Sequence, residues 1–112
     1  MRRLLPLLLL ASCSKGPHAD LQYISQARSA AAEWALVNEQ AGLGKLTAPY
    51  VATMRQSLRR QIQSSQSALT VPNSAYAREM QTLLGEPDDA PPQELRARAE
   101  RLKAIEDGLE SA

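Results

Sequence analysis

Residues 20–41 read DLQYISQARSAAAEWALVNEQA, and this stretch decides the fold. Apolar side chains recur in it at spacings of three and four, which is the period of one face of an α-helix. This stripe consists of Tyr23, Ala27, Ala30, Trp34, Val37 and Ala41, and Leu36 is expected to widen it. The pattern predicts an amphipathic helix over residues 20–41. We expect Trp34 to be an anchor of the core rather than part of a binding surface, because it lies on the apolar stripe.

The ends of this helix and the start of the next carry residue types that cap helices. Asp20 precedes the stripe and can accept a hydrogen bond from a free N–H of the first turn. Gly42 and Gly44 follow it, and glycine commonly ends a helix. Thr47 is then expected to cap a second helix that has Pro49 in its first turn and runs to about residue 69.

The second helix has its own apolar face. Its positions are Val51, Met54, Leu58, Ile62, Ser65 and Leu69. The connection between the two helices is short and contains glycine, so we expect the helices to be antiparallel neighbours.

Two further helical patterns follow. Asn73 or Ser74 is expected to cap a third helix that ends near Leu84, and Asp89 is expected to cap a fourth helix, with Pro91 in its opening. The apolar stripe of the fourth helix is Leu95, Ala99, Leu102, Ile105 and Leu109. No strand alternation occurs. The sequence therefore predicts one all-α domain over residues 20–112, a small helical bundle made of a long antiparallel hairpin and two further helices.

The beginning of the chain has a different character. Residues 1–3 carry two arginines, residues 4–10 are leucines interrupted by one proline, and residues 10–13 read Leu-Ala-Ser-Cys. This apolar run is too short to span a bilayer, which takes about 20 residues. A charged segment, an apolar segment and then small residues are typical of a cleavable export signal.

The Leu-Ala-Ser-Cys order resembles the lipobox of bacterial lipoprotein precursors. The resemblance implies a signal peptide over residues 1–12, cleavage between Ser12 and Cys13, and acyl chains such as palmitate on Cys13. Each buried methylene contributes about 0.8 kcal/mol, so two or three chains anchor a protein stably to a membrane. In such proteins an aspartate directly after the cysteine commonly causes retention in the inner membrane. This chain has Ser14 at that position, and the absence of an aspartate there favours the outer membrane.

Charge and linker length add two constraints. The chain has 13 basic and 12 acidic residues, and the loss of Arg2 and Arg3 leaves 11 basic residues. This nearly neutral balance argues against a nucleic-acid partner. Residues 13–19 are predicted to be the acylated cysteine and a short linker, whose six residues after the cysteine span about 20 Å at most. We therefore expect the domain to stay near the membrane.

One basic cluster is a candidate contact site. Arg55 and Arg59 lie four residues apart on one helix face, where like charges repel each other, and Arg60 adjoins them. One interpretation is that they pair with acids of neighbouring helices, such as Glu33 or Glu39, or are simply solvated. The other is contact with anionic lipid headgroups or an acidic partner, which arginine binds well through paired hydrogen bonds.

Side chains for catalysis or metal binding are sparse. His18 is the single histidine and lies in the linker, so we expect it to be solvated and expect no metal site. Asp88-Asp89 and Glu106-Asp107 are neighbours in sequence and are interpreted as capping or solvated groups, because an acid–base pair must face across a cleft. No cofactor is expected.

The expected function is therefore a non-enzymatic lipoprotein of the bacterial cell envelope that acts through an envelope protein partner. The alternative is a helical module that binds a small apolar ligand or lipid in a groove between helices. An Ala-rich core leaves little room for the usual pocket of about 300 Å³ or more. The carboxylate pattern gives little support to a third possibility, a cell-wall hydrolase. Because so small a domain buries little surface, a partner or self-association is expected to complete it.

Overall fold

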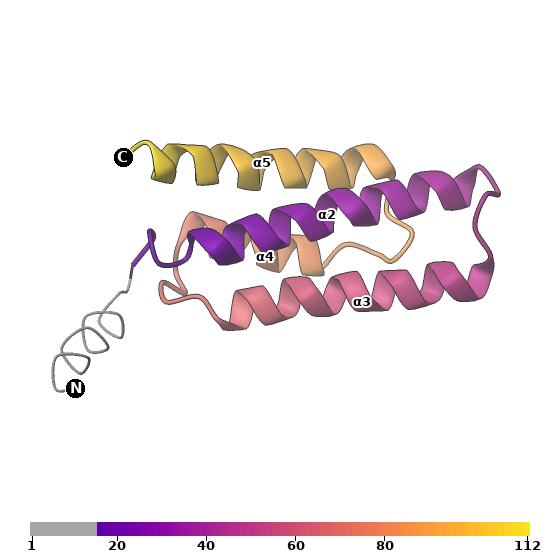
Figure 1. Cartoon of the computed structure of the whole chain (residues 1–112), viewed down its shortest axis with the longest axis horizontal. Coiled ribbons are helices and arrows are strands. Elements are labelled where there is room, and N and C mark those ends of the chain that lie inside the picture. The colour runs from indigo at the N-terminus through magenta and orange to yellow at the C-terminus, as the bar shows by residue number, and fades with distance from the viewer. Residues whose placement is uncertain (1–15) are drawn as a thin grey trace, which may run out of the picture.

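The computed structural model describes residues 16–112 and shows a bundle of helices (Figure 1). Its elements are α2 (Leu21–Gly42), α3 (Ala48–Ser67), α4 (Ala75–Leu84) and α5 (Pro92–Glu110). The described residues form no strand. The prediction of an all-α bundle, made of a long hairpin and two further helices, is confirmed.

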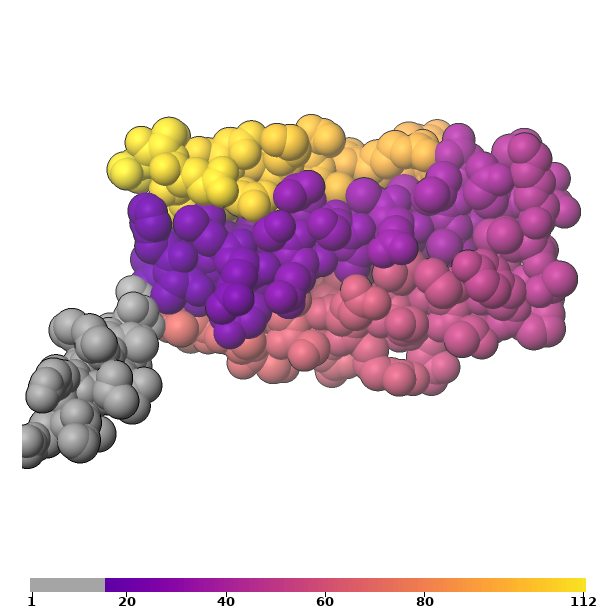
Figure 2. Space-filling model, in the orientation of Figure 1, coloured from indigo at the N-terminus to yellow at the C-terminus, as the bar shows by residue number. Residues whose placement is uncertain are grey.

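Helix α2 is the central element. It packs along α3 on one side and along α5 on the other, and α4 contacts α3, α5 and α2 (Figure 1). Both α3 and α5 run antiparallel to α2, so the first described residues and the C-terminus lie at the same end of the bundle. We call this end the base and the α2–α3 connection the tip. Figure 2 shows that side chains of α2 and α3 form the tip and that α5 stops short of it.

The core combines small residues of α2 with larger side chains of the other helices. Four alanines of α2 are buried, namely Ala27, Ala30, Ala31 and Ala35. Small side chains let neighbouring helices approach closely, which is how a chain without phenylalanine fills its interior. The largest fully buried apolar side chains are Trp34, Ile24, Leu58, Ile62, Met80, Leu83, Leu95 and Leu102. Burial of each is worth about 1.5–3 kcal/mol.

Two predicted caps are confirmed. The side chain of Thr47 accepts a hydrogen bond from the backbone N–H of Tyr50 at 3.4 Å. The side chain of Ser74 accepts one from the backbone N–H of Ala77 at 3.1 Å, which decides between the two caps proposed for this helix. At the tip, Gly44 has φ +72°, a conformation that strains other residues, so this glycine permits the turn after α2.

Two boundaries differ from the prediction. Helix α3 ends at Ser67, two residues early, although Leu69 still packs against the core. The predicted capping role of Asp89 is wrong, because α5 begins at Pro92 with Pro91 at its N-cap. The carbonyl of Pro91 accepts the first helical bonds, and Asp89 is exposed.

The predicted signal peptide and the predicted acylation site, Cys13, lie outside the described residues. Among residues 16–112, no helix is both long enough and apolar enough to cross a bilayer.

Candidate functional site

The first described residues are fastened to the base. The backbone N–H of Gly16 donates to Oγ1 of Thr70 at 3.0 Å. Residues 16–19 form a turn, in which the N–H groups of Ala19 and Asp20 donate to the carbonyls of Gly16 and Pro17, each at 3.1 Å. The predicted linker is therefore too long, since part of it belongs to the folded body. In the sequence, only residues 14 and 15 stand between Cys13 and this turn.

Asp20 holds the turn in place. Its side chain is fully buried, and Oδ1 accepts hydrogen bonds from the backbone N–H and the hydroxyl of Thr70, both at 2.9 Å. Oδ2 accepts from the N–H of Val71 at 3.2 Å and from the hydroxyl of Tyr76 at 2.6 Å. The side chain makes no capping bond to α2, so its predicted role is wrong. The α3–α4 connection presents three donors to this carboxylate and Tyr76 of α4 presents a fourth, and together they hold the start of α2 against the connection and the start of α4.

The charge states of this cluster follow from its hydrogen bonds. Burial raises the pKa of Asp20, but the bonds from Tyr76, Thr70 and Val71 lower it, and the net pKa lies below its ordinary value of 3.8. Burial and the bond to Asp20 raise the pKa of Tyr76 to about 12. At neutral pH the pair is therefore a carboxylate and a phenol, which is the arrangement of a structural hydrogen bond.

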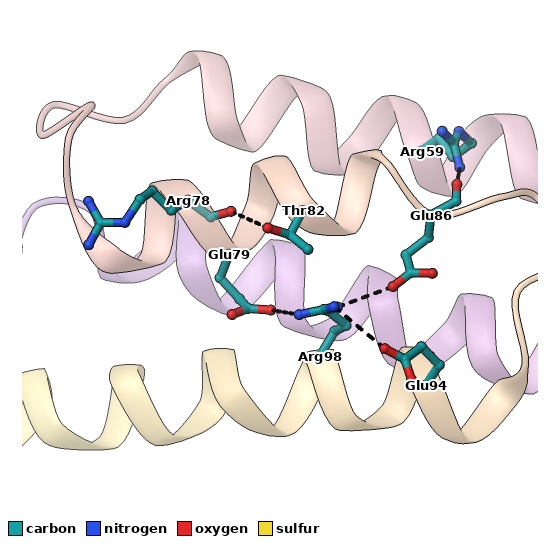
Figure 3. Close-up of polar contacts among 7 residues, drawn as sticks. All are labelled: Arg59, Arg78, Glu79, Thr82, Glu86, Glu94 and Arg98. Carbon is teal, nitrogen blue, oxygen red and sulfur yellow. Dashed lines mark hydrogen bonds and ion pairs between the residues drawn. The ribbon is translucent and has the colours of Figure 1, made fainter.

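Arg59, one of the three arginines selected from the sequence, binds the end of α4. It donates from Nη2 to the carbonyl of Leu84 at 2.6 Å. It also donates from Nη1 to the carbonyl of Glu86 at 2.8 Å (Figure 3). Its guanidinium carbon also lies 4.9 Å from the ring centre of Trp34. A positive charge is favourable at the carbonyl end of a helix and over an indole face. Arg59 thus joins α3, α4 and α2.

Arg55 belongs to a second set of bonds, which fixes the α4–α5 loop. Its Nε donates to Oδ1 of Asn38 at 2.9 Å. Nδ2 of Asn38 donates to the carbonyls of Asp88 at 3.0 Å and Ala90 at 2.8 Å. The indole N–H of Trp34 also donates to the carbonyl of Asp88, at 3.0 Å. These bonds therefore hold the loop through the backbone carbonyls of Asp88 and Ala90.

The predicted acidic partners of this cluster are wrong. Glu39 pairs with Arg96 of α5, and no ion pair of Glu33 forms among the described residues. Glu33 and Glu39 lie elsewhere on α2. Arg55 instead donates to the side-chain oxygen of Asn38, and Arg59 donates to backbone carbonyls. Arg60 is exposed and does not share their bonds. The structure brings two of the three arginines together and leaves the third apart.

A hollow of about 420 Å³ opens beside these two arginines. It is lined by Ala52, Arg55, Gln56, Arg59 and Asp88. Oδ1 of Asp88 lies 3.5 Å from Nη1 of Arg59, so the chain supplies its own counter-charge at this site. Together with the bond of Arg55 to Asn38 and the bonds of Arg59 to backbone carbonyls, this favours a structural role over the predicted anionic contact.

Carboxylates elsewhere are likewise engaged in the fold. Arg98 bonds to three of them, Glu79 at 3.0 Å, Glu86 at 3.2 Å and Glu94 at 3.5 Å, and so joins α4, the following loop and α5 (Figure 3). The hydrogen bond to Glu79 is the main reason that the pKa of Arg98 lies above its ordinary value. This arrangement accounts for the acidic residues around the α4–α5 connection.

The two neighbouring acids Glu106 and Asp107 have different surroundings. Glu106 was interpreted as a capping or solvated group, which is wrong: it is buried and accepts from Nε of Arg28 at 2.7 Å. Asp107 is exposed and pairs with Lys103 on the same helix at 3.1 Å. Glu106 points inward because α5 packs antiparallel to α2, which brings Arg28 opposite it. Among residues 16–112, no group of three or more metal-binding side chains comes together.

The tip carries an apolar surface that the sequence did not reveal. Leu36 is 50% exposed and Tyr50 is 49% exposed, although Leu36 had been expected on the buried stripe. Leu43, in the connection, is 62% exposed. A shallow hollow of about 170 Å³ lies here, with the apolar lining residues Leu36, Val37, Leu46, Tyr50 and Met54. We call these five residues and Leu43 the tip patch.

Comparison of the chain with protein-family descriptions, curated proteins and solved structures finds no match. The site is therefore interpreted from its own geometry.

The structural role of Arg59 predicts a contrast with Arg60. Arg59→Ala removes two hydrogen bonds to carbonyls and the contact with Trp34, so we expect a loss of about 2 kcal/mol in the free energy of unfolding. Arg60→Ala changes an exposed residue, and its effect should stay within about 0.5 kcal/mol. Urea unfolding followed by circular dichroism measures both. Equal effects of the two substitutions would contradict the assigned role.

Proposed function

We propose that the chain is a lipid-anchored protein of the bacterial cell envelope, more specifically of the outer membrane, with a non-enzymatic role that depends on protein–protein contact. The Leu-Ala-Ser-Cys order of residues 10–13 supports lipid attachment at Cys13. The exposed tip patch supports a role in binding, because an apolar surface of this kind commonly marks an interaction site.

The observation that carries the proposal is the fixed position of Gly16. Gly16 is bonded to Thr70 at the base, and it stands three residues after Cys13. Three residues span about 10 Å at most. A lipid on Cys13 would therefore hold the base of the bundle against the bilayer, with little freedom to move away. The tip lies at the opposite end of the 22-residue helix α2, about 33 Å from its start at 1.5 Å per residue.

Binding of a small apolar ligand is the second candidate, and the geometry favours it less. The hollow at the tip measures about 170 Å³ and is open to solvent along an exposed helix face. Ligand pockets are usually about 300–1,000 Å³. The tip hollow is closer in size to a socket for one or two side chains of a protein.

Replacement of the acylated residue tests the anchor. In bacteria expressing the full chain and fed an alkyne fatty acid, the parent should incorporate label and sediment with outer-membrane vesicles. Cys13→Ala should lose at least about 90% of the label, because no other cysteine is present to take it. In-gel detection of the label and density separation of the two membranes measure the two results.

Ser14→Ala is the matched control, since it alters the neighbouring residue and should keep the label. The mature parent should begin at Cys13 when its intact mass is measured. An unprocessed chain that retains Met1 and carries an unmodified thiol would refute the proposal.

A further inference from the structure

The exposed apolar residues of α2 and α3 are concentrated at the tip. Along the same two helices toward the base, the exposed side chains are polar, and they include Gln22, Gln26, Ser29, Gln61 and Ser64. Single exposed apolar residues need no explanation, but a group of them confined to one end of a polar surface does. Leu36, Leu43 and Tyr50 are each about half exposed or more, so the tip patch is left unburied by the fold of one chain.

The tip of the α2–α3 hairpin extends beyond α5. The hollow of the tip patch is lined only by α2, α3 and their connection. Figures 1 and 2 show that α5 begins short of the tip and runs away from it toward the base. Toward the base, α2 packs along α5 and also contacts α4, and α3 contacts α4. A groove between two antiparallel helices is the surface into which further helices pack.

The charges at the two ends of this groove are opposite. Glu33 lines the hollow on the side toward the base, and Lys45 adjoins Leu46 at the tip. Both are exposed, and neither side chain has an ion pair or hydrogen bond with any residue of the described range. A groove with one acid and one base at opposite ends is complementary to a copy of itself turned end for end.

We propose that the tip patch is the interface of a symmetric homodimer. Two copies pack groove against groove with their α2 helices antiparallel, so that Leu36 and Tyr50 of each enter the hollow of the other. Glu33 of each copy then faces Lys45 of its partner. The two hairpins complete a four-helix arrangement at the tip, which is a common way to bury the apolar faces of two helix pairs.

The chain's own N-terminal segment does not fit this surface. Residues 1–15 join the body at the base, and α2 separates that end from the tip by about 33 Å. Under the proposed processing only residues 13–15 remain, and they reach about 10 Å. A different protein partner would need the same end-for-end charge pattern, which a second copy has by construction.

Crosslinking in cells that express the full chain tests the pairing. Gln40 lines the hollow near the middle of the groove, so Gln40→Cys brings two thiols close to the two-fold axis. A short bismaleimide should convert it to a covalent homodimer at a yield at least five times that of Gln63→Cys, an exposed glutamine-to-cysteine control on α3. The parent chain, with Cys13 alone, gives the background, and its crosslinking would report a free Cys13 separately from the dimer.

Charge reversal then distinguishes this dimer from other complexes. In the Gln40→Cys chain, Glu33→Lys or Lys45→Glu alone should each weaken association about tenfold, because each places like charges together at both ends of the interface. The double reversal should restore the yield. Crosslinking no stronger than that of Gln63→Cys, a product containing a different protein, or failure of the double reversal to restore would each overturn the proposal.

Discussion

Asp20→Ala is expected to reduce the free energy of unfolding by about 3 kcal/mol, because it leaves buried donors without an acceptor. Four donors converge on this fully buried carboxylate, from Thr70, Val71 and Tyr76. The alanine variant removes all four bonds and leaves the hydroxyl of Tyr76 buried beside a small cavity. Since small domains are stable by only about 5–15 kcal/mol, a loss of this size is large.

Urea unfolding at pH 7 measures this loss, with Asp89→Ala as the control. Asp89 is an exposed aspartate without a bond in the described residues, so its replacement should change stability by less than about 0.5 kcal/mol. Amide hydrogen exchange should also show faster opening of residues 16–20 in Asp20→Ala. A stability within 0.5 kcal/mol of the parent would show that Asp20 does not fasten the base.

The same cluster predicts how stability depends on pH. The pKa of Asp20 is lower in the folded chain than its ordinary value of 3.8, so its contribution is complete above that value and is lost as pH falls through the lower folded pKa. The pKa of Tyr76 is raised to about 12, so its contribution is complete below its ordinary value of 10.0 and is lost as pH rises toward 12. In a plot of unfolding free energy against pH, Asp20→Ala should abolish the acid-side change and reduce the alkaline change, because burial alone still raises the pKa of Tyr76.

Trp34→Ala is expected to cost about 4 kcal/mol, the largest effect of any single substitution proposed for this protein. Trp34 is fully buried and is the largest side chain of the core. Its indole N–H donates to the carbonyl of Asp88, and its ring faces Arg59 at 4.9 Å. Removal therefore creates a cavity and releases the α4–α5 loop together with the arginine that binds the end of α4.

Trp34→Phe separates these contributions. Phenylalanine keeps most of the buried apolar area but has no N–H donor, so we expect a smaller loss of about 2 kcal/mol. Thermal and urea unfolding of the three proteins give the comparison. If the phenylalanine variant were as unstable as the alanine variant, the hydrogen bond to Asp88, rather than the packing of the ring, would be the main contribution of Trp34.

The base and the tip of the bundle have different proposed roles. At the base, the Asp20 cluster fixes the point at which the predicted lipid anchor joins the body. At the tip, the fold leaves apolar side chains exposed. The stiffness of α2, which the core around Trp34 supports, keeps these two ends apart. The proposed anchor and the proposed dimer interface therefore use separate surfaces, and either proposal can fail without the other.

Local patterns determined the number, kind and order of the helices. The three-and-four spacing of apolar residues over 20–41, together with the caps Thr47 and Ser74, is a property of neighbouring residues along the chain, so it could be found without a structure. Acylation at Cys13 also remains a prediction from local sequence alone, since it rests on four consecutive residues.

Only the tertiary structure decided what the polar residues bind. Asp20 and Glu106 look like solvated or capping groups in the sequence, but their partners Tyr76 and Arg28 are 56 and 78 positions away. Helix formation depends on residues within one turn of each other. Burial of a polar side chain and its choice of partner depend on which distant surfaces meet, so they could be known only from the folded chain.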